Sequence, residues 1–88
     1  MIEHRLEIVN RLGLHARAAA KLVHVASAHE ASVTLIAGGQ EVDAKSILGV
    51  LMLACAQGSH IQIKCEGPDA GDAWSALSAL VKDGFGEL

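Results

Sequence analysis

The stretch N-R-L-G-L-H-A-R-A-A-A-K, residues 10–21, places a histidine between two different hydrophobic patterns. Before it, apolar residues alternate with charged ones, from Ile2 through Leu6 to Ile8, which is the period of a strand. After it, apolar residues recur at the spacing of a helix: Ala19, Leu22, Val23 and Ala26. We therefore expect His15 to lie where a loop enters a helix.

A helix start is a favourable place for an anion, because its first backbone N–H groups have no partner within the helix and carry partial positive charge. Gly13 permits a sharp entry, and Arg17 offers donors suited to phosphate oxygens. Histidine adds a nucleophilic ring nitrogen. The stretch therefore predicts a phosphohistidine site, with His15 as nucleophile and with the Ala16 amide and the Arg17 guanidinium as phosphate-binding groups. The alternative is an ordinary loop histidine followed by a solvated arginine.

Three segments carry a resemblance to a known family. Gly13-Leu14-His15-Ala16-Arg17 resembles the active-site motif of the HPr family, the histidine-containing phosphocarriers of the bacterial phosphotransferase system. K-S-I-L-G-V at residues 45–50 resembles the regulatory serine segment of that family, and D-G-F-G-E at residues 83–87 resembles its usual ending. The likeness covers essentially the whole chain. One departure is Ala18, where the family has proline; alanine is a good helix former and returns an N–H donor, so we expect the chemistry to survive.

The resemblance implies that a phosphoryl group passes from a phosphohistidine of enzyme I to His15 and on to a histidine of a IIA-type component. No metal or organic cofactor is implied. The outlet stays open between sugar uptake and the nitrogen-related branch. Two other interpretations remain: a purely regulatory protein of the same family that works through Ser46, and a small-molecule-binding module of similar architecture. The second has no use for the arrangement around His15.

Composition excludes several classes of function. No linker, repeat or low-complexity segment divides the 88 residues, so residues 1–88 are expected to form one domain with a modest core. The net charge is −3, no basic run exists, and Trp, Phe and Tyr number one, one and none, so nucleic-acid binding is not expected. No secretory h-region or membrane-spanning apolar run is present, which predicts a soluble cytoplasmic protein without membrane insertion.

The sequence does not predict a metal site or a disulfide. Cys55 and Cys65 lack metal-ligand spacing, and we interpret both as reduced, buried small hydrophobes. The five histidines form neither an i, i+4 pair nor an H-E-x-x-H array. His4 is expected to be a structural residue, partly buried or facing an edge of the first strand. Asn10 is expected to hold the loop before His15 by a local hydrogen bond from its side chain to the backbone.

The remaining signals give the element order βαββαβα. Strands are expected over residues 2–9, 32–37, 40–43 and 60–66, with Gly38-Gly39 closing a hairpin. Helices are expected over residues 16–28 and 47–56, and a third, capped by Asp69, ends at Gly84. Its core face should hold Ala73, Leu77, Leu80 and Val81. This is an α+β fold with three helices on one face of a four-stranded, mainly antiparallel sheet. The resemblance implies an HPr-like open-faced β-sandwich with strand order 1-4-2-3.

Partner docking is predicted around His15. Arg17, Lys21 and His24 recur on one face of the first helix, which is either an ordinary solvated face or a basic stripe that attracts an acidic partner. Leu14 either fills the core or contributes to docking, and we favour docking.

The helix at residues 47–56 is too apolar to hide all its faces. We expect three residues in the core: Val50, Leu53 and Ala54. We expect another three to form an exposed docking patch: Ile47, Leu48 and Leu51. Ser46 has two interpretations. In the first, it is only the N-cap of this helix, which Gly58 ends. In the second, as the resemblance implies, it is also the target of an HPr kinase/phosphorylase.

Overall fold

A computed structural model describes residues 1–87. Its sheet contains four strands, each paired antiparallel, in the order β1-β4-β2-β3. The strands are β1 (Ile2–Glu7), β2 (Ser32–Ala37), β3 (Gln40–Asp43) and β4 (His60–Glu66). The predicted α+β class, the hairpin bounds and the strand order 1-4-2-3 are thus confirmed, with β1 ending at Glu7, two residues earlier than expected.

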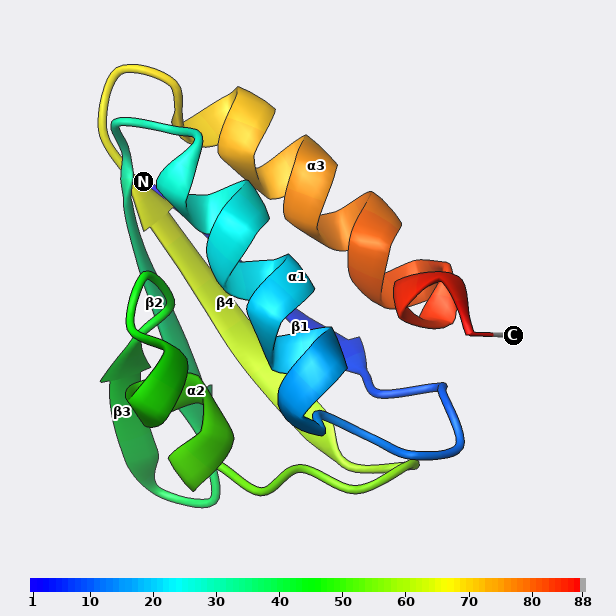
Figure 1. The fold of residues 1–88 in the computed structure, drawn as a ribbon. Coiled ribbons are helices and arrows are strands. Elements are labelled where there is room, and N and C mark those ends of the chain that lie inside the picture. The colour runs from blue at the N-terminus through cyan, green and yellow to red at the C-terminus, as the bar shows by residue number, and fades with distance from the viewer. Residues whose placement is uncertain (88) are drawn as a thin grey trace.

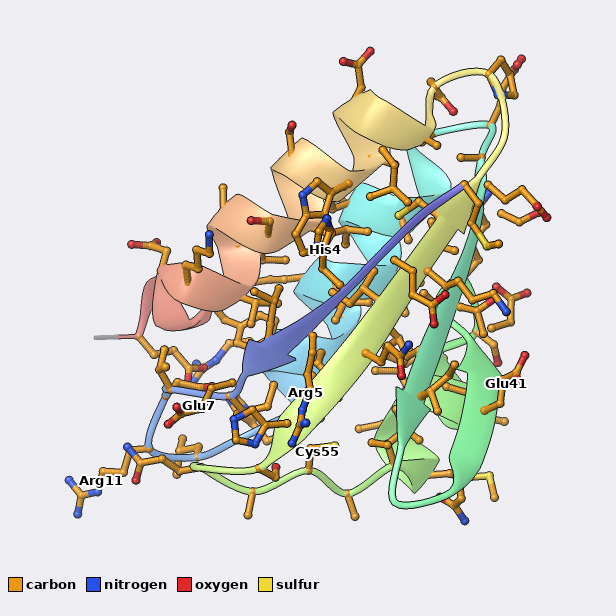
Figure 2. The ribbon with its side chains drawn as sticks, turned by 180° about the vertical axis from the view of Figure 1, so that it is seen from behind. His4, Arg5, Glu7, Arg11, Glu41 and Cys55 are labelled. Carbon is orange, nitrogen blue, oxygen red and sulfur yellow. The ribbon has the colours of Figure 1, made fainter. Side chains whose placement is uncertain are left out.

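Three α-helices cover one face of this sheet, as Figure 1 shows. The helices are α1 (Ala16–Ser27), α2 (Ile47–Met52) and α3 (Ala70–Lys82), followed by the short 3₁₀ helix η1 (Gly84–Gly86). Helices α1 and α3 lie side by side over the sheet and run roughly along β4 (Figure 1), and α2 packs against α1 and β3. The opposite face of the sheet is open, with Arg5 and Glu41 on it (Figure 2).

The core between the helices and the sheet is built almost entirely from aliphatic side chains. Its largest fully buried members are Phe85, Ile8, Leu22, Leu35, Ile61, Ile63 and Leu77. The inward residues of β4 alternate with partly buried or exposed ones, as the sequence pattern predicted. Both cysteines are buried and free, and burial raises the pKa of each thiol above its ordinary value. The interpretation of the cysteines as buried small hydrophobes is confirmed.

Helix α2 is shorter than the sequence predicted. It ends at Met52 instead of continuing through residue 56, and Ala54 adopts a left-handed conformation with φ of 49°. The chain turns at Ala54, and the carbonyl of Cys55, just after this turn, accepts a hydrogen bond from the Leu14 amide at 2.8 Å. Val50 is buried as expected, but the prediction that Ala54 is a core residue is wrong, since it is exposed.

One further side chain, Asp69, differs from expectation, whereas His4 lies at the edge of the sheet as one of its two predicted placements required. Asp69 holds the N-cap position of α3, but its carboxylate does not cap that helix and instead accepts from the amides of Glu30 at 3.0 Å and Ala31 at 2.7 Å. These bonds fasten the loop after α1 to the start of α3. His4 lies on the edge strand β1, and its ring stacks against Trp74 of α3 with ring centroids 4.7 Å apart. Within residues 1–87, no helix is long and apolar enough to cross a membrane.

Candidate active site

His15 occupies the N-cap position of α1, in an extended conformation with φ of −77° and ψ of 179°. Its carbonyl accepts the first helical bond, from the Ala19 amide at 2.8 Å. The amides of Ala16 and Arg17 belong to the first turn, where the helix itself provides no acceptor. The His15 side chain is 24% exposed. The predicted placement of His15 at a loop-to-helix junction is therefore confirmed.

The loop that presents His15 is held in one conformation by the backbone. Gly13 has φ of 67°, and a Cβ atom placed on it would lie 2.4 Å from the Cys55 carbonyl oxygen. Only glycine fits at this point without displacing the loop. Asn10 is fully buried, and its Nδ2 donates to the Gly13 carbonyl at 2.8 Å. The local hydrogen bond predicted for Asn10 is thus confirmed.

The C-terminal segment supplies an acidic residue that sequence reasoning missed. Glu87 Oε2 lies 2.5 Å from His15 Nε2 and 3.8 Å from Arg17 Nε, while its Oε1 accepts from Asn10 Nδ2 at 2.9 Å. The hydrogen bond from Asn10 has the largest effect on the pKa of the Glu87 carboxyl and lowers it. Burial raises this pKa, whereas the contacts with His15 and Arg17 lower it further. The pKa of Glu87 therefore lies below its ordinary value. No periodicity relates residues 72 apart, so the sequence contained no signal for this contact.

Two anchors fix the segment that carries Glu87. Phe85 is fully buried in the core, with a left-handed φ of 58°. Lys21 of α1 donates its Nζ to the Phe85 carbonyl at 2.7 Å. One of the predicted docking cations is thus engaged with the C-terminal segment.

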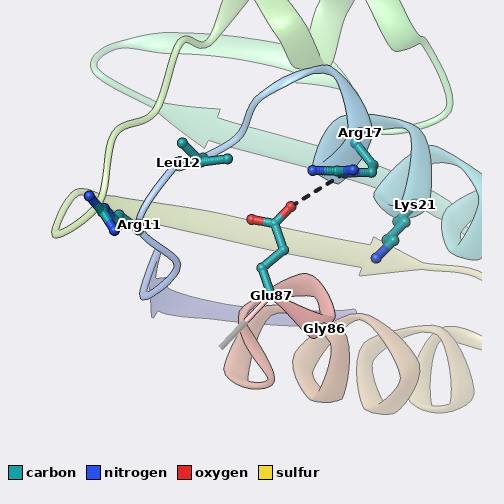
Figure 3. Close-up of a pocket in the computed structure, with 6 residues that line it drawn as sticks. All are labelled: Arg11, Leu12, Arg17, Lys21, Gly86 and Glu87. Atoms are coloured by element: carbon teal, nitrogen blue, oxygen red, sulfur yellow. Dashed lines mark ion pairs between the residues drawn. The ribbon is translucent and has the colours of Figure 1, made fainter.

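An open cavity of about 610 Å³ lies beside this cluster. Figure 3 shows Glu87 facing Arg17, with Lys21, Arg11 and Leu12 around the same opening and Gly86 at its wall. Three cations and one carboxylate therefore surround a space next to His15. Such a surface favours an anion, because the positive side chains outnumber the negative one. Within residues 1–87, no group of three potential metal ligands is found.

The predicted docking residues fall into three groups, which are exposed, partly buried and buried. Arg17 and His24 are exposed, and Ile47 and Leu48 on α2 are 39% and 72% exposed. Leu51 is partly buried and packs against the core. The preference for Leu14 as a docking residue is wrong. It is 4% exposed, because the Gly13 turn and the bond to Cys55 direct it inward into the hydrophobic core.

Two exposed apolar residues near the site were missed. Met52 is 68% exposed at the end of α2, and Leu12 is 63% exposed in the loop before His15. The exposure of Met52 follows from the early end of α2. For the longer helix expected from the sequence, only Ile47, Leu48 and Leu51 were predicted to be exposed. Leu12 follows from the loop geometry, which the sequence pattern did not resolve.

Comparison with known proteins agrees with the geometry. The family model described as "PTS HPr component phosphorylation site" matches residues 2–83. The chain belongs to the HPr family. It is 48% identical over 87 residues to the phosphocarrier protein HPr of Xylella fastidiosa strain Temecula1, covering 99% of this chain and 98% of the relative. It is also 43% identical over 86 residues to the phosphocarrier protein NPr of Shewanella violacea, covering 98% and 94%.

A solved structure of HPr from Thermoanaerobacter tengcongensis superimposes with a TM-score of 0.96 at 39% identity, covering 100% of this chain and 99% of the other. The four-stranded HPr fold is therefore shared in full. Family membership makes this chain a phosphocarrier of the phosphotransferase system. Members of this family interact with enzyme I and IIA components.

Proposed function

We propose that residues 1–88 act as one cytoplasmic phosphocarrier domain that accepts a phosphoryl group on His15 from enzyme I and passes it to a IIA-type component. The observation that carries this proposal is the position of His15 at the start of α1. Its ring is partly exposed there, beside the first-turn amides, which have no acceptor within the helix, and beside the Arg17 side chain, which is 70% exposed.

The transfer requires few groups on this chain. The lone pair of His15 Nδ1 attacks the phosphorus atom, the new N–P bond forms as the N–P bond of the donor histidine breaks, and the donor ring leaves with its electron pair. The Ala16 amide and the Arg17 guanidinium hold the phosphoryl oxygens as charge spreads over them. The second transfer reverses these roles, with His15 as the leaving group. Positioning and electrostatic stabilisation therefore account for the chemistry.

We propose that donor and acceptor dock on the same surface, because each must bring its own histidine to His15. The surface combines the cations of α1 with the apolar patch of α2: Arg17, Lys21, His24, Ile47, Leu48 and Leu51. The exposure of Ile47 and Leu48 supports this assignment, and exposed Met52 extends the patch. Exposed apolar groups with a charged rim are typical of protein-binding surfaces.

Ser46 is proposed as a regulatory phosphorylation site for an HPr kinase/phosphorylase. Its Oγ accepts from the Gly49 amide at 3.2 Å, so Ser46 is the N-cap of α2 and is also exposed. A phosphate at this helix start would place negative charge next to Ile47 and Leu48. That charge would disfavour docking, because it must be desolvated when a partner covers the patch.

Incubation with phosphoenolpyruvate and a matching enzyme I tests the carrier function. We expect an acid-labile, base-stable phosphoryl group on the wild type and none on His15→Ala, which should stay folded because His15 is a partly exposed N-cap. Arg17→Ala should slow the transfer without abolishing it. Labelling that persists in His15→Ala would move the site elsewhere, and no labelling of the wild type would support a regulatory protein or a binding module.

The acceptor is tested in the same assay. Relatives include both HPr and NPr proteins, so the labelled protein is offered to a sugar-type and a nitrogen-type IIA component. The faster discharge identifies the outlet.

A further inference from the structure

We propose that Glu87 is the positioning residue of the site, holding His15 with its proton on Nε2 so that Nδ1 presents a lone pair to the phosphoryl donor. This inference rests on the proposed function for its consequence, but its structural basis is independent. It assigns a role in the reaction to a residue of the C-terminal segment, 72 residues away from His15 in the sequence.

The contact itself determines where the proton lies. A ring nitrogen and a carboxylate oxygen 2.5 Å apart share a proton in a charge-assisted hydrogen bond. Glu87 also accepts from Asn10 and faces Arg17, and both contacts favour the ionised carboxylate. The proton therefore belongs to Nε2 of His15. Among residues 1–87, no hydrogen-bond partner of His15 Nδ1 is found, so this nitrogen is available to react.

The carboxylate also assists the second half of the cycle. Once Nδ1 carries the phosphoryl group, a ring that keeps its Nε2 proton is positively charged. The negative Glu87 stabilises that charge. When the N–P bond breaks again, the electron pair returns to Nδ1 and the ring leaves as neutral imidazole. The Nε2 proton stays in place throughout, so neither transfer requires a proton to enter or leave the site.

The position of Glu87 is fixed independently of His15. Phe85 fills the core two residues before it, and Lys21 binds the Phe85 carbonyl. Asn10, itself fully buried, binds the second carboxylate oxygen. The Glu87 side chain is only 15% exposed as a result. An acid held from three directions can orient the imidazole, whereas a mobile surface acid could not.

The charged groups that face this pair come from two elements besides the C-terminal segment. Helix α1 contributes Arg17 and Lys21, and the loop before His15 contributes Arg11. The apolar α2 contributes no ionisable side chain. Glu87 is therefore the acidic member of a cluster that is otherwise cationic, and its removal changes the environment of His15 specifically.

The matched test uses three variants. Glu87→Ala removes the carboxylate. Glu87→Gln keeps an acceptor oxygen of the same reach but no charge. Asp83→Asn removes one negative charge from the same segment at an exposed side chain that does not contact His15. Melting temperatures establish that each variant is folded, and Glu87→Gln preserves the packing if Glu87→Ala does not.

The first measurement is the ¹⁵N and ¹H resonances of the His15 ring in the unphosphorylated proteins. We expect a resolved Nε2–H proton signal in the wild type and in Asp83→Asn, and its loss to solvent exchange in Glu87→Ala. The second measurement is the rate of phosphoryl acceptance from enzyme I. Hydrogen-bond partners that orient metal-bound histidines contribute about 10–100-fold, and by analogy we expect Glu87→Ala to be slower by about tenfold, with Glu87→Gln intermediate.

An unchanged ring signal in Glu87→Ala, or a transfer rate equal to that of Asp83→Asn, would overturn the inference. The absence of a resolved Nε2–H signal in the wild type would do the same. Failure of enzyme I to label the wild type would instead reject the proposed function, and the ring resonances would still decide whether Glu87 fixes the tautomer.

Discussion

Gly13→Ala is the change most expected to uncouple the active-site loop from the rest of the fold. Gly13 has φ of 67°, and a Cβ atom there would lie 2.4 Å from the Cys55 carbonyl oxygen and 3.0 Å from the Ala56 Cα. Both neighbours are backbone atoms, so neither can rotate away. The loop must therefore move, and the 2.8 Å bond from the Leu14 amide to that carbonyl would be lost.

The magnitude follows from two contributions. A left-handed conformation costs an L-residue about 1–2 kcal/mol. A buried amide without its partner costs about 1–3 kcal/mol. We expect a loss of about 3 kcal/mol in the free energy of unfolding. For a domain of this size each kcal/mol shifts the melting temperature by about 4–8 °C, so a fall of about 12–24 °C should be observed.

Gly58→Ala is the matched control. Gly58 also has a positive φ, 89°, but a Cβ atom there would meet nothing within 4 Å. This variant should show only the conformational contribution, about 1–2 kcal/mol. Thermal and urea unfolding measure both changes. The rate of phosphoryl acceptance should fall by about 100-fold only in Gly13→Ala, because displacement of a nucleophile by about 1 Å has an effect of this size. Equal losses of stability in the two variants would refute the steric argument.

Four other changes have distinct expected outcomes. Ser46→Asp should keep the melting temperature within about two degrees, because aspartate is also a good cap, while slowing phosphorylation by enzyme I; an unaltered rate would reject the regulatory role. Leu48→Asp should weaken binding of both partners with little loss of stability, whereas Leu14→Ala should lower the free energy of unfolding by about 2–5 kcal/mol in urea titrations. The free energy of unfolding should fall as pH drops below about 4.5, because the pKa values of Asp69 and Glu87 lie below 3.8 and 4.5 and both carboxylates stabilise the fold only while ionised. Unchanged acid sensitivity in the double variant Asp69→Asn, Glu87→Gln would contradict this.

The sequence predicted the features that depend on short-range patterns. Alternation defined β4 at its observed bounds, and Gly38-Gly39 located the hairpin between β2 and β3. The N-cap signal of Ser46 was also sufficient, since its side chain makes the expected bond. These features arise from residues within a few positions of one another, where backbone preference and hydrophobic period act directly.

Features that depend on tertiary contacts were harder to predict. The apolar run after Ser46 was compatible with a helix to residue 56, but the chain turns at Ala54 and the Cys55 carbonyl pairs with the Leu14 amide. The same contact made Leu14 a core residue. Asp69 had a suitable side chain for capping, yet two amides of the loop after α1 compete for it. For Leu14 and Asp69, a long-range hydrogen bond overrode the local preference.

The active site depends on the cooperative fold for the same reason. His15 lies near the N-terminus, but the carboxylate that contacts it is 72 residues away in the sequence. The segment that bears this carboxylate is held by Phe85 in the core and by Lys21 of α1. Local helix formation alone could place Arg17 and the first-turn amides near His15, but it could not supply Glu87. A partly unfolded chain would therefore keep the binding motif and lose the group that orients the imidazole. We therefore expect partial unfolding to lower the rate of phosphoryl transfer through His15 more than it lowers the affinity for phosphate at the helix start.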